Sequence, residues 1–203
     1  MSENLIYTKS FAPPPVDKRE LLRYAGVRES TPETEALLDD CIRESWDRLS
    51  YKVCYCEYEI KYFDGEINLG FAKTTSHSLR EALAGCHKIL LFCATVGVDI
   101  DRLIARYSSL SPARSVILQA FGTERVEALC DELCREIGCA AEEVGQVCTK
   151  RFSPGYGDLP LDMQREIFAA LDCARRIGVS LNDNLFMTPT KSVTAIIGIR
   201  NVK

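Results

Sequence analysis

Histidine is scarce in this sequence: His77 and His87 are the only two among 203 residues. A hydrolase built on a Ser-His-Asp or Cys-His arrangement would have to use one of them, and neither lies in a nucleophile motif such as Gly-x-Ser-x-Gly. The glycines form neither the Gly-x-x-x-x-Gly-Lys-Ser/Thr phosphate loop nor a Gly-x-Gly-x-x-Gly turn after a strand. The sequence therefore disfavours hydrolases and proteins that bind nucleoside triphosphates or dinucleotides.

The sequence also has no long positively charged segment and no long apolar segment. No segment is rich in lysine and arginine, and the formal net charge of -4 gives no concentrated positive field for a phosphate backbone. No stretch approaches the roughly 18 consecutive apolar residues of a membrane helix, and residues 1 to 10 carry no apolar core of signal-peptide length. We therefore expect a cytoplasmic protein with neither a nucleic-acid nor a membrane partner.

Cysteine, by contrast, is abundant, with ten residues. Because no secretory signal is apparent, the thiols are expected to stay reduced. Cys130 and Cys134 lie one helical turn apart beside Leu133 and Ile137, where cysteine behaves as a small apolar residue. No Cys-x-x-Cys pair or histidine-rich partner completes a metal-binding pattern. We therefore predict a structural role for the cysteines and no metal site.

Apolar residues that recur every three or four positions predict helices along much of the chain. One helix has two candidate N-caps, either Ser30 in a capping box or Thr31 with Pro32 at the first helical position. Gly138 and Gly178 are expected to end the last two helices. The predicted helices are Asp17 to Tyr24, Ser30 or Thr31 to about Ser50, Ser78 to Ala84, one from Asp99 through Tyr107, Ser111 to about Ile137, and Leu161 to Ile177.

Alternation of apolar and polar residues predicts strands. Val53 to Tyr62 and Ile67 to Phe71 both alternate, and Asp64-Gly65 between them supplies a turn, which indicates an antiparallel hairpin. Further predicted strands are Lys88 to Thr95, Val147 to Phe152 and Lys191 to Gly198.

The order of these elements points to one fold class. Strands and helices alternate irregularly, and the clear hairpin is antiparallel, so we predict an α+β fold with a mixed, mainly antiparallel twisted sheet and several helices. The length suits a single core. We expect one globular domain over residues 31–203, preceded by an N-terminal arm or cap over residues 1–30.

The most distinctive segment is the loop Arg151-Phe-Ser-Pro-Gly-Tyr-Gly-Asp158. Pro154 stiffens its backbone, Gly155 and Gly157 let main-chain groups approach a ligand closely, and Tyr156 offers an aromatic face with a polar tip. The loop suits either a ligand site or a tight turn from a strand into a helix with an exposed tyrosine. Its chemistry alone names no ligand.

With its surroundings, the loop resembles a known family. The pattern Arg-x-x-Pro-Gly-Tyr, followed by Gly178-Val-x-Leu181 and Phe186-Met-x-Pro189-x-x-Ser192-Val193, is similar to the activation domain of cobalamin-dependent methionine synthase. The shorter proteins that carry this domain alone look more similar still. The likeness extends back to Thr95-Val-Gly97 and to the helix around Glu124-Arg-Val-Glu127, and it covers roughly residues 86 to 198.

The resemblance implies a function in reactivation, with the fold of that domain. The chain would bind S-adenosylmethionine and dock on a separately encoded methionine synthase that holds the cobalamin and lacks its own activation domain. A flavodoxin-like donor would reduce inactive cob(II)alamin by one electron, and the resulting cob(I)alamin would take a methyl group from S-adenosylmethionine. The chain would thus contribute to methyl transfer rather than act as an independent catalyst.

The resemblance also implies a set of ligand residues. Arg151 and the backbone through Ser153 would line the ligand, Tyr156 would contact it, and Glu127 would face its cationic α-amino and sulfonium groups. Lys191 and Ser192 are candidates to face the cofactor. The implied residues for S-adenosylmethionine are Glu127, Arg151, Ser153, Pro154, Gly155 and Tyr156.

Two departures from the family pattern bear on affinity. The chain stops at Lys203, whereas longer members continue and add a ligand tyrosine, and Asp17 is only a candidate for their acidic residue near the start of the domain. We therefore expect weak binding or a site that a partner completes. A competing hypothesis is a non-catalytic binding or scaffold protein for another corrinoid methyltransferase. An independent methyltransferase ranks third because no catalytic base is apparent.

Overall fold

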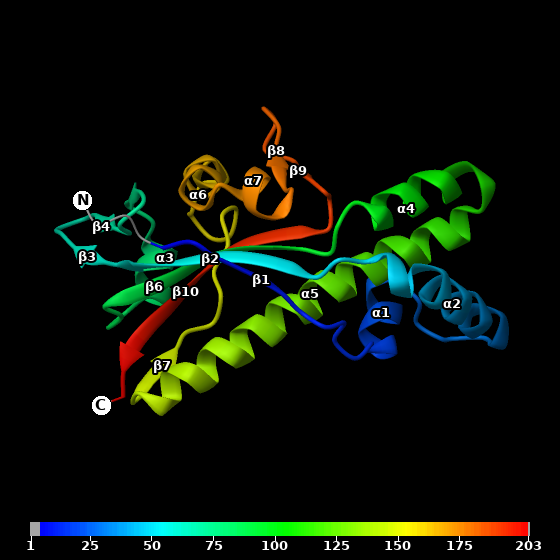
Figure 1. The fold of residues 1–203 in the computed structure, drawn as a ribbon, viewed down its shortest axis with the longest axis horizontal. Coiled ribbons are helices and arrows are strands. Elements are labelled where there is room, and N and C mark those ends of the chain that lie inside the picture. Colours follow the sequence, from blue (N-terminus) through cyan, green and yellow to red (C-terminus); the bar gives the residue numbers. More distant parts are fainter. Residues whose placement is uncertain (1–4, 203) are drawn as a thin grey trace.

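The computed structural model describes residues 5–202, so residues 1–4 of the expected arm and residue 203 of the expected domain lie outside the described residues. One antiparallel sheet runs through the centre of the molecule (Figure 1). In spatial order, its strands are β1 (Tyr7–Ser10), β2 (Lys52–Glu59), β6 (Lys88–Thr95), β10 (Ser192–Asn201) and β7 (Gln146–Cys148). The short strands of the two smaller sheets are β3 (Lys61–Tyr62), β4 (Ile67–Asn68) and β5 (Lys73–Thr74), and β8 (Ser180–Leu181) and β9 (Met187–Thr188).

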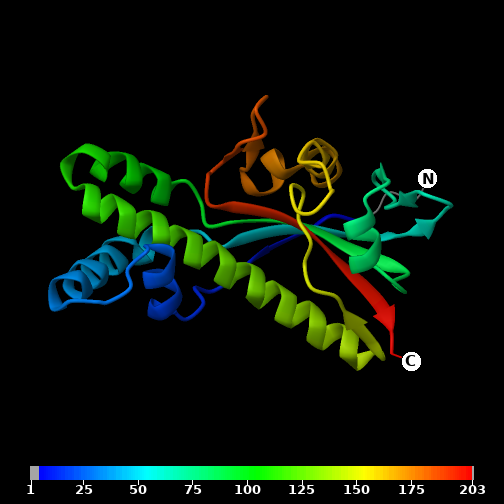
Figure 2. The same cartoon turned by 180° about the vertical axis from the view of Figure 1, so that it is seen from behind.

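Helices lie on both faces of this sheet. Their bounds are α1 (Lys18–Tyr24), α2 (Pro32–Ser45), α3 (His77–Ala82), α4 (Asp99–Leu110), α5 (Pro112–Glu143), α6 (Met163–Leu171) and α7 (Cys173–Ile177), with a 3₁₀ turn η1 (Trp46–Arg48). Long helix α5 crosses one face, with α1, α2 and α4 beside it, while α6 and α7 lie over the other face (Figures 1 and 2). Within residues 5–202, no helix is both long and apolar enough to cross a membrane.

Strand β6 shows why the sheet is buried on both sides. Leu90 and Phe92 belong to the core that α5 covers, whereas Ile89, Leu91 and Cys93 belong to the core under α6 and α7. Every residue of β6 after Lys88 is buried, so the strand reads as a continuous apolar run instead of alternating. The predicted α+β fold with a mainly antiparallel sheet is confirmed.

The predicted hairpin is wrong in its extent. Strand β2 ends at Glu59 and pairs along its whole length with β6, while β1 pairs with its first half. Only β3 and β4, on either side of the Asp64-Gly65 turn, form the hairpin. Alternation identifies a strand but not its partner, and here the main partners come from distant parts of the sequence.

Helix boundaries follow the local hydrogen-bonding groups. The Thr31 hydroxyl accepts a bond from the Thr34 amide, so the structure selects Thr31 over Ser30 as the cap of α2. Helix α3 starts before the predicted cap because Ser76 supplies its N-cap instead of Ser78.

Two longer helices also depart from prediction. Helix α5 continues through Gly138 to Glu143, because a glycine inside a helix costs free energy without breaking it. The helix predicted from Leu161 to Ile177 is divided into α6 and α7 at Asp172, which has a left-handed φ of 48°. Gly178 does form the predicted C-cap of α7.

The described part of the N-terminal arm is built into the fold. Strand β1 is an edge strand of the sheet, and the fully buried Arg125 of α5 donates hydrogen bonds to the carbonyl oxygens of Pro14 and Pro15. The same guanidinium pairs with Glu124, whose carboxylate also accepts a bond from the Asp17 amide. A buried charge needs such partners, so this contact fixes the arm against α5.

Candidate functional site

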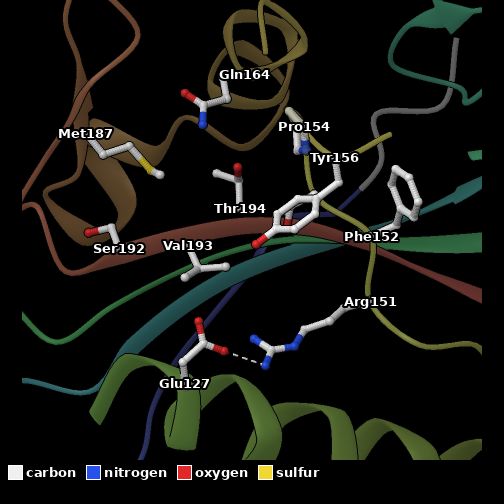
Figure 3. Close-up of a pocket in the computed structure, with 11 residues that line it drawn as sticks. Glu127, Arg151, Phe152, Pro154, Tyr156, Gln164, Met187, Ser192, Val193 and Thr194 are labelled. Atoms are coloured by element: carbon white, nitrogen blue, oxygen red, sulfur yellow. Dashed lines mark hydrogen bonds and ion pairs between the residues drawn. The ribbon is translucent and has the colours of Figure 1, made fainter. Parts of the chain in front are cut away.

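A cavity of about 400 Å³ lies between the sheet, α5, α6 and the segment that follows β7 (Figure 3). Its wall combines charged, hydroxyl, amide and apolar groups. The lining residues are Glu127, Arg151, Phe152, Ser153, Pro154, Tyr156, Gln164, Met187, Ser192, Val193 and Thr194.

The loop from Arg151 to Asp158 forms one side of the cavity. Phe152 fixes its start by exchanging two backbone hydrogen bonds of 2.8 Å with Ile196 of β10. Gly157 has a φ of +57°, and a Cβ there would lie 2.5 Å from the Ser78 hydroxyl, so the chain needs glycine at this point. The loop then leaves Tyr156 70% exposed at the cavity wall.

An ion pair closes the α5 side of the cavity. Arg151 Nη2 lies 2.6 Å from Glu127 Oε2 and 3.1 Å from Asp131 Oδ1. The Arg151 and Glu127 side chains are 26% and 34% exposed, which leaves both charges accessible. Since both contacts engage Nη2 and a guanidinium has five N–H donors, further donors exist for an anionic ligand group. The pair can therefore offer a ligand the carboxylate of Glu127 as an acceptor and the guanidinium of Arg151 as a donor.

Strand β10 forms the floor between the charged side and α6. The side chains of Ser192, Val193 and Thr194 border the cavity there (Figure 3). The Ser192 hydroxyl lies 2.8 Å from the Pro189 carbonyl oxygen and 2.8 Å from the Thr95 hydroxyl, so it is already hydrogen bonded. Its first role is to hold the start of β10 in place.

Most of the predicted site residues meet at this cavity. Of the implied residues, all except Gly155 and Lys191 line it. Gly155 instead supports the loop through a bond from its amide to the Leu159 carbonyl. Lys191 lies across Gly122 of α5 and donates to the Thr123 hydroxyl, and burial lowers the pKa of its ammonium group.

Two acidic residues near the cavity, the candidate Asp17 and the loop residue Asp158, have other contacts. Asp158 accepts bonds from the Ser76 hydroxyl and from the His77 and Ser78 amides, so it caps α3 instead of facing the cavity. These bonds hold the pKa of its carboxyl well below the usual range. Asp17 caps α1 and borders a separate groove on the other side of the Arg151–Glu127 pair.

The side chains of five lining residues were not predicted to form the site, although the backbone of one of them, Phe152, was expected to line the ligand. Phe152 and Met187 stood inside the motifs that carried the resemblance, and Val193 and Thr194 follow Ser192 on the same strand, so adjacency was a usable signal. No sequence signal pointed to Gln164, because its position depends on where α6 docks. The side chains that were not predicted are those of Phe152, Gln164, Met187, Val193 and Thr194.

Seven of the ten cysteines are buried in the core, Cys134 and Cys148 are half-buried, and Cys139 is exposed. In the part of the chain that the structure describes, all ten are free, and no cluster of three or more His, Cys, Asp or Glu residues could hold a metal ion. Burial raises the pKa of the Cys41 thiol to about 11 and also raises the pKa of Cys130, which adjoins the Arg151 pair. Such thiols stay protonated at neutral pH and are poor nucleophiles or metal ligands.

Comparison with known proteins identifies the fold. No family model matches the sequence, and no curated protein matches it significantly. Among solved structures, it is similar to the crystal structure of the MetH reactivation domain bound to AdoHcy (S-adenosylhomocysteine), with a TM-score of 0.71 and 12% sequence identity. The match covers 97% of this chain and 79% of that chain. The chain therefore has the fold of the MetH reactivation domain, as the sequence resemblance implied.

Proposed function

We propose that this protein binds S-adenosylmethionine in the cavity beside Arg151. We further propose that it supports reductive remethylation of cob(II)alamin in a separately encoded methionine synthase. One observation carries the first step: Glu127, Arg151 and Tyr156 meet at one cavity. The fold is shared with a reactivation domain whose structure contains AdoHcy, which supports the same assignment.

The cavity has the size and charge that such a ligand needs. About 400 Å³ falls within the range of small-molecule sites. The α-carboxylate of the ligand would take free N–H donors of Arg151, and its α-amino group would lie beside Glu127. The carboxylate of Glu127 would also favour the sulfonium of S-adenosylmethionine over the neutral thioether of S-adenosylhomocysteine.

The residues of this chain would bind and orient the methyl donor. The corrinoid would be held by the partner and would supply the nucleophilic cobalt, so this chain need not provide a catalytic base. Tyr156, which is exposed at the cavity wall, would cover the bound ligand.

The partner would be a cobalamin-binding methionine synthase that lacks its own activation domain, with a flavodoxin-like protein as electron donor. Ten reduced cysteines suit the cytoplasm, where we propose that this reaction takes place.

Isothermal titration tests the ligand assignment. We expect wild type to bind S-adenosylmethionine and S-adenosylhomocysteine, and Arg151→Gln to weaken both about tenfold to a hundredfold, because a bond to a charged group is lost. Arg102→Gln is the matched control, since Arg102 is 71% exposed on α4 and pairs only with Asp99 among the described residues. Absence of binding to wild type would refute the assignment and leave the scaffold hypothesis.

Co-purification tests the partner assignment. The full chain should be retained by a methionine synthase that lacks an activation domain, and addition of S-adenosylmethionine with a flavodoxin-like donor should restore methylcobalamin in that synthase. Binding of the ligand without any restored methylcobalamin would reject the proposed partner and keep the ligand site.

A further inference from the structure

Lys191 is a half-buried lysine without a counter-ion among the described residues. Its side-chain nitrogen donates to the Thr123 hydroxyl over 3.0 Å, and within residues 5–202 it forms no ion pair. The Thr123 hydroxyl gives its own proton to the Gln119 carbonyl oxygen, so it only accepts from the ammonium group. Because an ammonium group has three N–H donors, two of them have no protein partner in this part of the chain.

The carboxylate that acts on Lys191 is held by another residue. Asp101 of α4 favours the charged lysine, but its two oxygens accept from the amide and the hydroxyl of Thr190, over 2.8 and 2.5 Å. Burial outweighs this attraction and lowers the pKa of the Lys191 ammonium group. The folded protein therefore holds this positive charge at a cost in free energy.

Helix α5 leaves a slot for the Lys191 side chain. Gly122 lies beneath the aliphatic stem, and a Cβ there would lie 2.9 Å from Lys191 Cγ and 3.2 Å from Lys191 Cε. Since any larger residue at position 122 would collide with the stem, the glycine lets the side chain lie across α5 and end at Thr123.

The ammonium group lies next to the cavity. Ser192, the following residue of the chain, lines the cavity, and Thr123 lies one helical turn before Glu127 on the same side of α5. Glu127 and Ser192 both lie on the left of the cavity in Figure 3. Lys191 itself is not a lining residue, so its charge belongs to the rim of the site and not to its wall.

We propose that Lys191 forms an ion pair with a carboxylate of the docked methionine synthase. This inference rests on the proposed function and adds one contact between the two proteins. Methyl transfer requires the cobalt to reach the methyl group of the ligand, so the partner must cover the cavity and its rim. A carboxylate at the rim supplies the missing counter-ion, and docking removes water from the pair and strengthens it.

Association of the whole chain with a cobalamin-loaded synthase that lacks an activation domain tests the proposal. We expect Lys191→Met, which keeps an unbranched apolar stem, to weaken association about tenfold or more, because a bond between two charged groups is lost. Its affinity for S-adenosylhomocysteine should equal that of wild type. Lys61→Met is the matched control, because Lys61 is an exposed lysine on β3, away from the cavity wall.

Salt dependence and thermal melting separate an ion pair from other roles. A rise from about 50 mM to about 500 mM salt should weaken the association of wild type more than that of Lys191→Met, because salt screens the pair. The variant should melt at the same temperature as wild type or higher, since it removes a charge that is costly to bury.

Each outcome decides a specific point. Unchanged association of Lys191→Met would overturn the inference, and so would weaker association with an unchanged salt dependence, which would indicate a neutral acceptor on the partner. A lower melting temperature would also overturn it, because the ammonium group would then stabilise the fold. If wild type binds S-adenosylhomocysteine but not the synthase, the proposed partner fails together with the inference. Association that is indifferent to Lys191 leaves the proposed function standing.

Discussion

Tyr156 combines a position on the cavity wall with a 70% exposed side chain. An exposed aromatic contributes little to folding, whereas one that covers a bound ligand contributes to affinity. We predict that Tyr156→Ala weakens S-adenosylmethionine binding about tenfold and changes the free energy of unfolding by less than about 0.5 kcal/mol. Titration and chemical denaturation measure the two quantities, and equal affinity of variant and wild type would show that the ring does not contact the ligand.

Asp158 gives a pH-dependent prediction. Its bonds to Ser76, His77 and Ser78 lower the pKa of the carboxyl in the folded state. A group whose folded pKa is depressed stabilises the protein above its unfolded pKa of about 4, and that contribution is lost as the pH falls through the folded pKa. Asp158→Asn should therefore lower the melting temperature at pH 7.

The same substitution should make the melting temperature depend less on pH in the acidic range. The difference in melting temperature between wild type and Asp158→Asn should shrink progressively below about pH 5. Melting curves recorded from pH 7 to pH 3 measure this. A difference that stays constant over that range would mean that the charge of Asp158 contributes nothing to the cap of α3.

At the scale of elements, two glycines of α5 have opposite surroundings. A Cβ on Gly138 would meet no atom within 4 Å, whereas one on Gly122 would lie 2.9 Å from Ile100 Cγ1 and from Lys191 Cγ. We predict that Gly138→Ala stabilises the protein by about 0.5–1 kcal/mol, because alanine is the better helix former. Gly122→Ala should destabilise it, since the added methyl collides at the contact with α4.

Urea denaturation of the two alanine variants tests this pair. Stabilisation of Gly138→Ala together with destabilisation of Gly122→Ala fits an unbroken α5 that packs closely on α4. A loss of stability in Gly138→Ala would argue that α5 ends near residue 138, as the sequence alone had suggested.

The predictability of each element depended on how local its cause was. Strand β6 and the Thr31 or Ser30 cap could be located because apolar runs and capping groups are local signals. Ser76 escaped prediction because Asp158, 82 residues away in sequence, completes that helix end. The hairpin was overextended because strand alternation contains no information about partners.

At the scale of the whole molecule, the site lies where segments distant in sequence meet. Glu127 comes from α5 on one face of the sheet, Gln164 from α6 on the other, and Thr194 from the strand between them. Residues within the loop motif could be predicted from the sequence. The place of Gln164 on the cavity wall could not, because it depends on how α6 docks on the sheet.

A crystal structure of the protein with S-adenosylhomocysteine tests the central claim most directly. The account predicts the ligand in the cavity, with its amino acid end beside Glu127 and Arg151. A ligand bound elsewhere on the molecule, or a cavity that stays without ligand at saturating concentration, would contradict it.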